Sequence, residues 1–285
     1  MTTRRRFLES VSAAAALAAL PRALHALPGA PLIRERLDRF GVQLYTVRTE
    51  MQKSVENTLA AVAEAGYREV EFAGYFSREP AALRAQLDAL KLTAPSAHVS
   101  LDALERDWPG QAAAAKALGH RWLIVASVDT SKLPSTAEWK ALAGRFAAVG
   151  KRAVADGLRF GYHNHNVELK PLADGARPLD ILLGETDPSL VDFEMDLYWA
   201  ISAGVEPLDY FAKYPGRFRC VHVKDGSPRP EFAMRDVGSG IIDWPRIFAK
   251  HKQAGIEHYF VEHDQPKDAL ASIQASAKYL KQLSF

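Results

Sequence analysis

One pattern recurs along this chain: an alanine-rich, helix-like stretch ends at a glycine, and a short apolar run follows. It occurs at Gly66, Gly119, Gly157 and Gly255. A glycine directly after a helix supplies the left-handed backbone conformation that ends it, and each following run has the length of a buried strand. Helices alternating with short apolar strands predict consecutive β-α units and therefore a parallel sheet.

Eight strands are predicted from this alternation. They are Phe40–Tyr45, Glu69–Ala73, Lys91–His98, Trp122–Ser127, Arg159–His163, Leu190–Met195, Arg217–Val223 and Tyr259–Glu262. The helices predicted between and after them are Val55–Ala65, Pro80–Leu90, Gln111–Leu118, Thr136–Ala155, a short one near Pro178–Gly184, Trp244–Ala254 and Pro266–Leu283. Eight alternations in about 250 residues favour a closed barrel, and no G-x-G-x-x-G motif opens the first helix. The predicted fold is α/β, a single (β/α)₈ TIM barrel over residues 31–285.

Residues 1–30 are predicted to be an export signal rather than part of the barrel. The arginines Arg4 and Arg5 precede Phe7-Leu8, and an uncharged alanine- and leucine-rich stretch follows from Val11 to Leu20. This arrangement resembles a twin-arginine signal, with small residues near 26–30 as the cleavage zone. The apolar run is too short to span a bilayer, which takes roughly 20 residues. The mature protein is therefore expected to be periplasmic or secreted, with no membrane anchor.

Replacing Arg4 and Arg5 together by lysine is expected to leave the protein in the cytoplasm. The reason is that the arginine pair is the part of such a signal that identifies it for export. Cell fractionation and immunoblotting against the wild type check this. Unchanged export of the double variant would contradict the prediction.

The charge of the chain changes sign without this signal. Residues 1–26 contribute +3 to the total of +2, from four arginines and one glutamate, so the remainder carries −1. No basic stripe is left to bind nucleic acid, and a nucleic-acid partner is not expected. Cys220 is the single cysteine. It can form no internal disulfide and is expected to be a buried structural thiol.

Polar side chains collect where the predicted strands end, which is where the active sites of such barrels lie. Taken singly, each has an ordinary explanation, such as a hydrogen-bonded core histidine or an aspartate that caps the next helix. Together they include five residues of metal-ligand type that converge on one barrel mouth: His163, His165, Asp196, His222 and Glu262. A divalent cation is the simplest common partner for buried carboxylates and imidazoles.

Five short motifs then carry a resemblance to a known family. They are the residues GVQLY at 41–45, GYHNH at 161–165, DLYW at 196–199, VHVKD at 221–225 and VEHD at 261–264. In this order and at barrel spacing, the chain from about Phe40 to Leu283 resembles the sugar phosphate isomerase/epimerase superfamily of xylose-isomerase-like TIM barrels. Ketose 3-epimerases, hydroxypyruvate isomerases and inosose dehydratases belong to it, and endonuclease IV is a more distant relative.

The resemblance implies one divalent metal ion, held by Glu, Asp, His and Glu from strands five to eight. It assigns Asp196, His222 and Glu262 as ligands, and His163 stands in the place of the strand-five glutamate, with His165 as the alternative. A mixed nitrogen and oxygen set suits Mn, Co, Fe or Zn. Trp199 stands where relatives that bind more metal have a histidine, which argues against a multi-zinc nuclease site.

The histidine on strand five also affects the expected chemistry. The epimerases of the family use two metal-bound glutamates on opposite sides of the substrate, and only Glu262 remains here. One-base chemistry stays possible, because Glu262 or Glu168 could take the proton next to a metal-polarised carbonyl. Lys224 could stabilise the enolate oxygen, or it could simply pair with Asp225 or a ligand carboxylate. The other strand-end residues are expected to contact the substrate: Gln43, Tyr45, Glu71, His98, His165 and Trp199.

Three functions are compatible with this pattern. The first is a metal-dependent sugar isomerase/epimerase-type enzyme that abstracts a proton next to a carbonyl. The second is a lyase or hydrolase of 3-keto-glycosides on the same metal site. The third, of another class, is a non-catalytic periplasmic carbohydrate-binding barrel. In each the partner is a small carbohydrate, and phosphorylated substrates are not expected because no Gly-rich phosphate cradle is present. Glu71 and Glu194 are competing carboxylates that pairing with basic residues would explain equally well.

Overall fold

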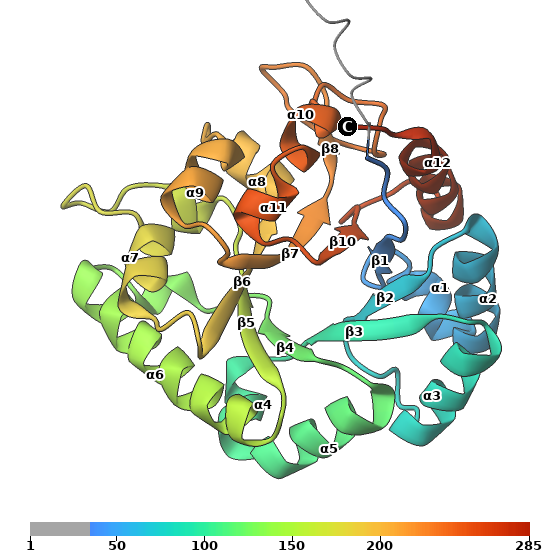
Figure 1. Ribbon diagram of the computed structural model, residues 1–285, viewed down its shortest axis with the longest axis horizontal. Helices are drawn as coiled ribbons and strands as arrows, with labels where there is room; N and C mark the ends of the chain where they lie inside the picture. Colours follow the sequence, from blue (N-terminus) through green and yellow to red (C-terminus); the bar gives the residue numbers. More distant parts are fainter. Residues whose placement is uncertain (1–34) are drawn as a thin grey trace, which may run out of the picture. The chain divides into compact units, whose positions relative to one another are not determined.

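A computed structural model describes residues 35–285, so the predicted export signal lies outside the described residues. Eight parallel strands form a closed barrel in the order β1-β10-β7-β6-β5-β4-β3-β2, with helices around it (Figure 1). The barrel strands are β1 (Gly41–Gln43), β2 (Glu69–Phe72), β3 (Thr93–His98), β4 (Trp122–Val125), β5 (Arg159–His163), β6 (Val191–Asp196), β7 (Phe218–Val223) and β10 (His258–Val261). The predicted (β/α)₈ barrel is confirmed.

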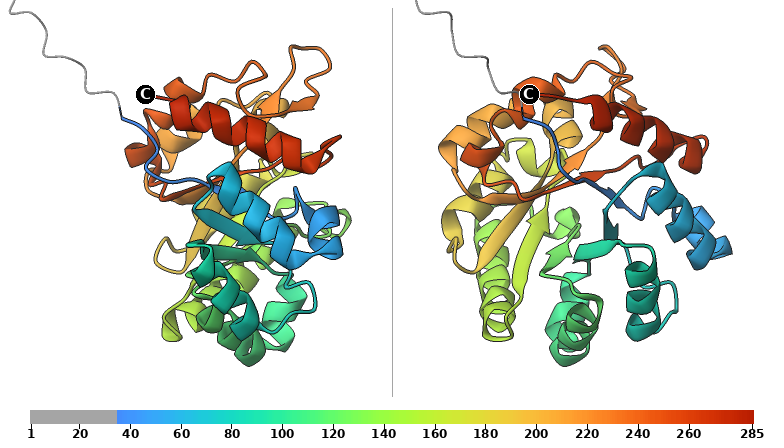
Figure 2. Two further views of the ribbon diagram at one scale, coloured as in Figure 1. Left: turned by 90° about the vertical axis from the view of Figure 1, so that its right-hand side faces the viewer. Right: turned by 45° about the vertical axis from the view of Figure 1, so that its right-hand side comes forward.

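The helices outside the barrel are more numerous than predicted. They are α1 (Arg48–Lys53), α2 (Val55–Ala65), α3 (Pro80–Ala89), α4 (Leu101–Arg106), α5 (Trp108–Leu118), α6 (Thr136–Ala155), α7 (Pro178–Glu185), α8 (Leu197–Ser202), α9 (Pro207–Lys213), α10 (Trp244–Phe248), α11 (His251–Ala254) and α12 (Ala269–Gln282). The prediction of a single helix over Trp244–Ala254 is wrong, because the chain turns between α10 and α11. The C-terminal helix α12 packs beside α2 and completes the ring (Figure 2).

Short elements complete the description. The 3₁₀ turns η1 (Thr130–Lys132) and η2 (Val167–Leu169) follow β4 and β5, and β8 (Asp225–Gly226) pairs with β9 (Met234–Arg235) as a small antiparallel hairpin. Within residues 35–285, no helix combines the length and the apolar composition needed to cross a membrane.

The helix ends follow the local sequence signals. Gly66, Gly119 and Gly255 directly follow helices and have φ angles of 102°, 80° and 86°. Side chains with a Cβ rarely adopt these values, so glycine ends the helix there. The longest helix, α6, begins with a capping box in which Ser135 and Glu138 each bind the other's backbone N–H.

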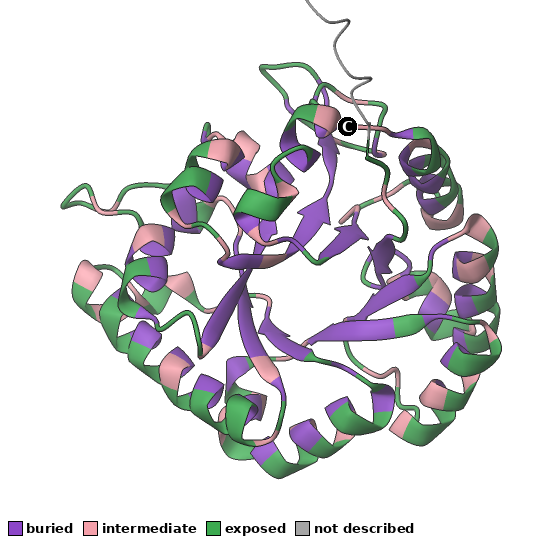
Figure 3. Ribbon diagram, in the orientation of Figure 1, coloured by how far each residue is buried: buried purple, intermediate pink, exposed green. Residues whose placement is uncertain are grey.

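Alternate residues of each strand point into the barrel, which stacks the interior in layers. A small apolar layer consists of Trp122, Ile124, Cys220 and Phe260. Gly41 makes room for it, because a Cβ at this position would lie 2.5 Å from the Phe260 ring. Two residues further along β7 and just beyond β10, the inward positions are His222 and Glu262, both buried. The barrel strands are buried almost throughout (Figure 3). The apolar layer therefore lies directly beneath the polar residues His222 and Glu262.

His120, between α5 and β4, is a buried histidine away from that polar layer. Its Nδ1 donates to the Ala94 carbonyl oxygen over 2.6 Å. Burial lowers the pKa of His120 to about 4, and the bond to Ala94 offsets only part of this effect. The folded state therefore favours the neutral ring. Because the pKa is near 6.5 in the unfolded chain, stability is lost as the pH falls from 6.5 towards 4.

Between pH 7.5 and pH 5, the wild type is expected to lose ~2 kcal/mol more free energy of unfolding than His120→Gln. Urea unfolding of both proteins at both pH values measures this difference. The same pH dependence in the two proteins would contradict the expectation.

Candidate active site

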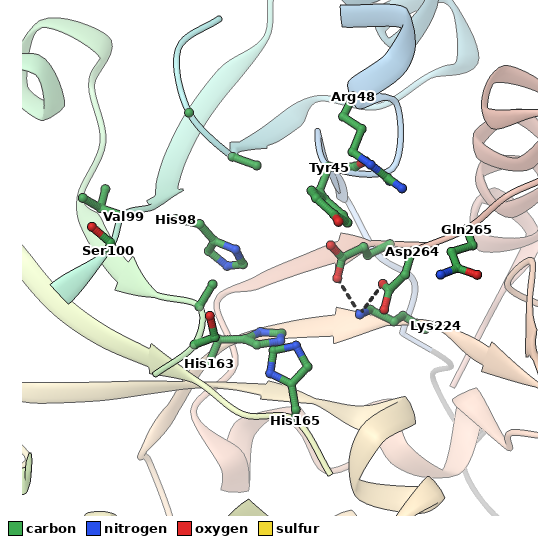
Figure 4. A pocket seen from close by; sticks show the side chains of 15 residues that line it. Tyr45, Arg48, His98, Val99, Ser100, His163, His165, Lys224, Asp264 and Gln265 are labelled. Carbon is green, nitrogen blue, oxygen red and sulfur yellow. Dashed lines mark hydrogen bonds and ion pairs between the residues drawn. The ribbon is translucent and has the colours of Figure 1, made fainter. Parts of the chain in front are cut away.

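A cavity of about 650 Å³ opens at the C-terminal ends of the barrel strands, within the usual size range of small-molecule sites. Figure 4 shows His98, His163 and His165 on one side of it and Lys224 and Asp264 on another. The lining residues are Tyr45, Arg48, Ala73, Gly74, His98, Val99, Ser100, Ala126, Ser127, His163, His165, Lys224, Glu262, Asp264 and Gln265. The cavity thus lies where the sequence predicted the site.

Four of the predicted metal ligands lie together at the bottom of this cavity. His222 Nδ1 is 2.7 Å from Glu262 Oε2 and 3.9 Å from Asp196 Oδ2. His163 Nε2 is 3.7 Å from the same Asp196 oxygen. All four residues are buried. Ligand atoms of Asp196, His222 and Glu262 lie within 4.8 Å of one another, close enough to bind one ion.

The remaining nitrogens of the two histidines bind carboxylates underneath. His222 Nε2 is 2.7 Å from Glu71 Oε2 and 3.1 Å from Glu194 Oε2, and His163 Nδ1 is 3.0 Å from the latter oxygen. An ionised carboxylate only accepts hydrogen bonds, so these nitrogens carry the protons. By the same rule, His222 Nδ1 donates to Glu262 Oε2, and a bound metal ion would take the place of that proton. Burial lowers the pKa of His163, so this ring is neutral and the lone pair of its Nε2 faces Asp196. Metal-binding histidines are held in this way, and this geometry favours His163 over His165 as the strand-five ligand.

The cluster also has more buried carboxylate than its hydrogen bonds satisfy. Among the described residues, Glu194 Oε1 accepts no hydrogen bond, and the closest partner of Asp196 Oδ2 is the Lys224 ammonium group, whose Nζ lies 2.8 Å away. Burial raises the pKa of Asp196 to about 6, and Lys224 and His222 counter this only in part. A mixed set of buried carboxylates and imidazoles, in which two carboxylates share one ammonium group, fits a divalent transition metal. Asp196, His222, Glu262 and His163 would hold it.

Lys224 is buried between carboxylates of the same cluster. Its Nζ is 2.6 Å from Glu262 Oε2, 2.8 Å from Asp196 Oδ2 and 2.8 Å from Asp264 Oδ1. Two roles were left open for Lys224: stabilising an enolate oxygen, or pairing with Asp225 or a ligand carboxylate. The pairing with ligand carboxylates is present in the structure. Asp225, the other proposed partner, instead accepts from the backbone and from Trp244 Nε1.

The first three strands contribute a second group of polar residues below the cavity. His98 Nε2 is 2.8 Å from Glu194 Oε2 and 3.1 Å from Glu71 Oε2. Burial alone would lower the pKa of His98, but Glu71 and Glu194 raise it to about 10. Gln43 Nε2 donates to Glu71 over 2.7 Å. His98 lines the cavity, whereas Gln43 and Glu71 are fully buried and do not line it in the described part of the chain, so their contact with a substrate stays a prediction.

Glu168 and Trp199 also do not line the cavity in the described part of the chain. Glu168 is buried, and it accepts from the Tyr162 hydroxyl over 2.7 Å and from the His165 backbone N–H over 2.9 Å. Trp199 lies with its ring centre 5.9 Å from that of His165. Both therefore support the loop that carries His165, while their direct contact with substrate stays a prediction. Tyr45 and His165 do line the cavity.

Several polar residues that line the cavity were absent from the predicted site, among them Asp264, Arg48 and Gln265, and Glu194 beneath it was named only as a competing carboxylate. Asp264 and Glu194 could have been found from strand alternation, because each lies two positions from a predicted ligand, Glu262 and Asp196 respectively. Arg48 could not, because it lies in α1, a helix that the sequence did not predict. It stacks over the Tyr45 ring at 4.0 Å, at the rim of the cavity.

Comparisons with known proteins agree with this fold. The family described as "Xylose isomerase-like TIM barrel" matches residues 59–283. An inosose dehydratase of Geobacillus kaustophilus is 24% identical over 265 residues, which cover 80% of this chain and 85% of that protein. A solved sugar phosphate isomerase/epimerase from Parabacteroides distasonis is 27% identical, with a TM-score of 0.76 over 86% of this chain and 98% of that one. The IolI protein, solved with a bound zinc atom, shares the fold at 15% identity, with a TM-score of 0.68 over 85% of this chain and 98% of that one.

The two sequence-similar relatives named above are enzymes by their names, and this chain is an enzyme of their general type. The family match covers well over half of the chain, and the closed eight-stranded barrel is the fold that the family name describes. The chain therefore belongs to the xylose isomerase-like TIM barrel family.

Proposed function

We propose that this enzyme removes the proton next to the carbonyl of a small keto sugar or keto-polyol and then eliminates a leaving group from the neighbouring carbon. One observation carries the proposal. Among the described residues, Glu262 is the one carboxylate that both belongs to the metal-ligand cluster and lines the cavity. A base in this position can reach a substrate whose carbonyl is bound at the cluster.

Glu262 is in the form that a base needs. Burial alone would raise its pKa, but Lys224 and His222 hold the pKa well below its ordinary value. The side chain is therefore an ionised carboxylate at neutral pH. A divalent ion, when bound, would polarise the substrate carbonyl and acidify the adjacent C–H. The Lys224 ammonium group lines the cavity beside Glu262 and can offset the charge that develops on the enolate oxygen.

Elimination suits a site with its base on one side. Within residues 35–285, β5 contributes no carboxylate to the cavity lining; it presents His163, and the loop after it presents His165. His163 Nδ1 is bound to Glu194, and Nε2 faces the metal cluster. Two-base epimerisation thus lacks its second carboxylate. In elimination, Glu262 can deliver the proton it has taken to the departing oxygen on the same face. The similar protein from Geobacillus kaustophilus is by its name a dehydratase.

Isomerisation is the second candidate, and it begins with the same proton abstraction. It differs in that the proton is returned to the adjacent carbon and no group departs. The similar protein from Parabacteroides distasonis is by its name an isomerase/epimerase. A non-catalytic binding barrel is set aside because the sequence relatives are enzymes. The export signal stays a prediction; it would place the reaction outside the cytoplasm.

The proposal is tested with zinc-supplied protein in deuterated water, with inosose and a 3-keto-glucoside as separate substrates. Reversible proton abstraction predicts incorporation of deuterium next to the carbonyl of the recovered substrate. Elimination further predicts a product that has lost water or released its aglycone, whereas a product without such loss indicates isomerisation. Magnetic resonance and mass spectrometry distinguish these outcomes. Neither exchange nor product with either substrate would count against the proposal.

A further inference from the structure

Lys224 binds the same carboxylate oxygens that the metal ion would use. Its Nζ is 2.6 Å from Glu262 Oε2 and 2.8 Å from Asp196 Oδ2. The lysine side chain is 1% exposed, so water screens its charge very little. A single buried ammonium group thus pairs with two of the four predicted metal ligands.

This arrangement conflicts with metal binding in the same place. Zinc and similar ions bind carboxylate oxygens at roughly 2.0–2.2 Å. Because Nζ is 2.6 Å from Glu262 Oε2, an ion on that oxygen would be no more than ~5 Å from the ammonium group. Two positive charges so close together in a buried site repel strongly.

The structure offers the ammonium group another partner nearby. Asp264 Oδ1 is 2.8 Å from Lys224 Nζ, and its side chain is 27% exposed. Asp264 lies outside the ligand clusters and lines the cavity, as does Lys224. Figure 4 shows Lys224 joined to Asp264 at the edge of the open space. Because this contact is already made, a small movement of Nζ away from Asp196 and Glu262 would keep the ammonium group paired with Asp264 and increase its distance from the metal.

We propose that Lys224 is a resident counter-ion that metal binding displaces from Asp196 and Glu262 onto Asp264, and that this exchange sets the affinity of the site for metal. In the metal-free protein, Lys224 neutralises the two ligand carboxylates. In the loaded protein, Asp264 holds it. The inference rests on the proposed metal site.

Calorimetric titration of the chelator-treated full chain with Zn²⁺ tests the first half. Lys224→Met keeps the length of the side chain but removes its charge, so it should bind Zn²⁺ about 10-fold or more tightly than the wild type. Lys224→Gln, which can still donate to the carboxylates, should shift affinity in the same direction if the methionine variant fails to fold. Lys116→Met is the matched control, because Lys116 is exposed and pairs with Asp156; its affinity should not change.

Asp264→Asn tests the second half and should have the opposite sign. Without its alternative partner, Lys224 stays on the ligand carboxylates, and Zn²⁺ affinity should fall about 10-fold. In the Lys224→Met background, Asp264→Asn should have little further effect, because Asp264 acts through the lysine.

The outcomes separate this inference from the metal site itself. If neither the wild type nor any variant binds Zn²⁺, the proposed metal site is wrong, and the proposed exchange of Lys224 is wrong as well. If the wild type binds Zn²⁺ but both Lys224 variants bind it equally or more weakly, the site stands and the counter-ion role is overturned. If Asp264→Asn weakens binding equally in both backgrounds, Asp264 attracts the metal directly, and the displacement onto Asp264 is overturned.

Discussion

Replacing Glu262 with glutamine is expected to lower turnover by about 10²- to 10⁴-fold, because the substitution removes the proposed base. Glutamine keeps the shape of the side chain but cannot accept the substrate proton. It also removes one charged ligand beside His222 and Lys224, so metal affinity should fall as well. Turnover is therefore measured both at low and at saturating zinc. A loss that excess zinc restores completely would contradict the assignment of Glu262 as the base.

A matched control exists at the other end of the barrel. Glu69 is also a buried glutamate paired with a histidine, and His258 Nδ1 lies 2.8 Å from its Oε2. Glu69→Gln makes the same chemical change at the start of β2, away from the cavity. Its turnover per folded molecule should stay near that of the wild type. An equal loss in both variants would attribute the Glu262 effect to the fold rather than to catalysis.

Replacing Glu194 with glutamine is expected to lower metal affinity by about 10- to 100-fold without removing a ligand. Glu194 Oε2 lies within 3.1 Å of nitrogens of His98, His163 and His222. Burial and Glu71 would raise the pKa of Glu194, but the histidines lower it to about 2. The residue is thus an anion that fixes which ring nitrogen carries the proton.

Glu168→Gln is the comparison for this second effect. Glu168 is also buried, but its partners are Tyr162 and the His165 backbone rather than a ring nitrogen of a predicted ligand. Its zinc affinity, measured by the same calorimetry, should equal that of the wild type. If instead Glu168→Gln lost zinc and Glu194→Gln kept it, the account of how the histidines are oriented would be wrong.

Much of the site could be predicted because strand alternation is a local property. Once β7 is placed, Cys220, His222 and Lys224 must point the same way, from the apolar layer towards the cavity. The same rule relates Glu194 to Asp196 on β6. The glycines that end α2 and α5 similarly depend on one residue each. These features need no knowledge of distant parts of the chain.

Other features depend on how the segments beyond the strands bend. Glu168 follows β5 by only a few residues, but in the η2 turn its carboxylate accepts from the Tyr162 hydroxyl, and among the described residues it does not line the cavity. The division of α10 from α11 is likewise a local turn within an apolar pattern that continues through it. Lys224 pairs with Asp196 at the end of β6 and with Glu262 and Asp264 just after β10, rather than with Asp225, and this is set by distances across the barrel.

The position of the bound metal decides whether Asp196, His222, Glu262 and His163 form one metal site. The measurement is the anomalous scattering of zinc in crystals of the protein grown with Zn²⁺. We expect one ion within roughly 2.0–2.2 Å of Asp196, His222 Nδ1 and Glu262, with His163 completing the set. An ion held instead by the neighbouring group of His98, Glu194 and the Nε2 of His222, or no ion at either place, would contradict this expectation.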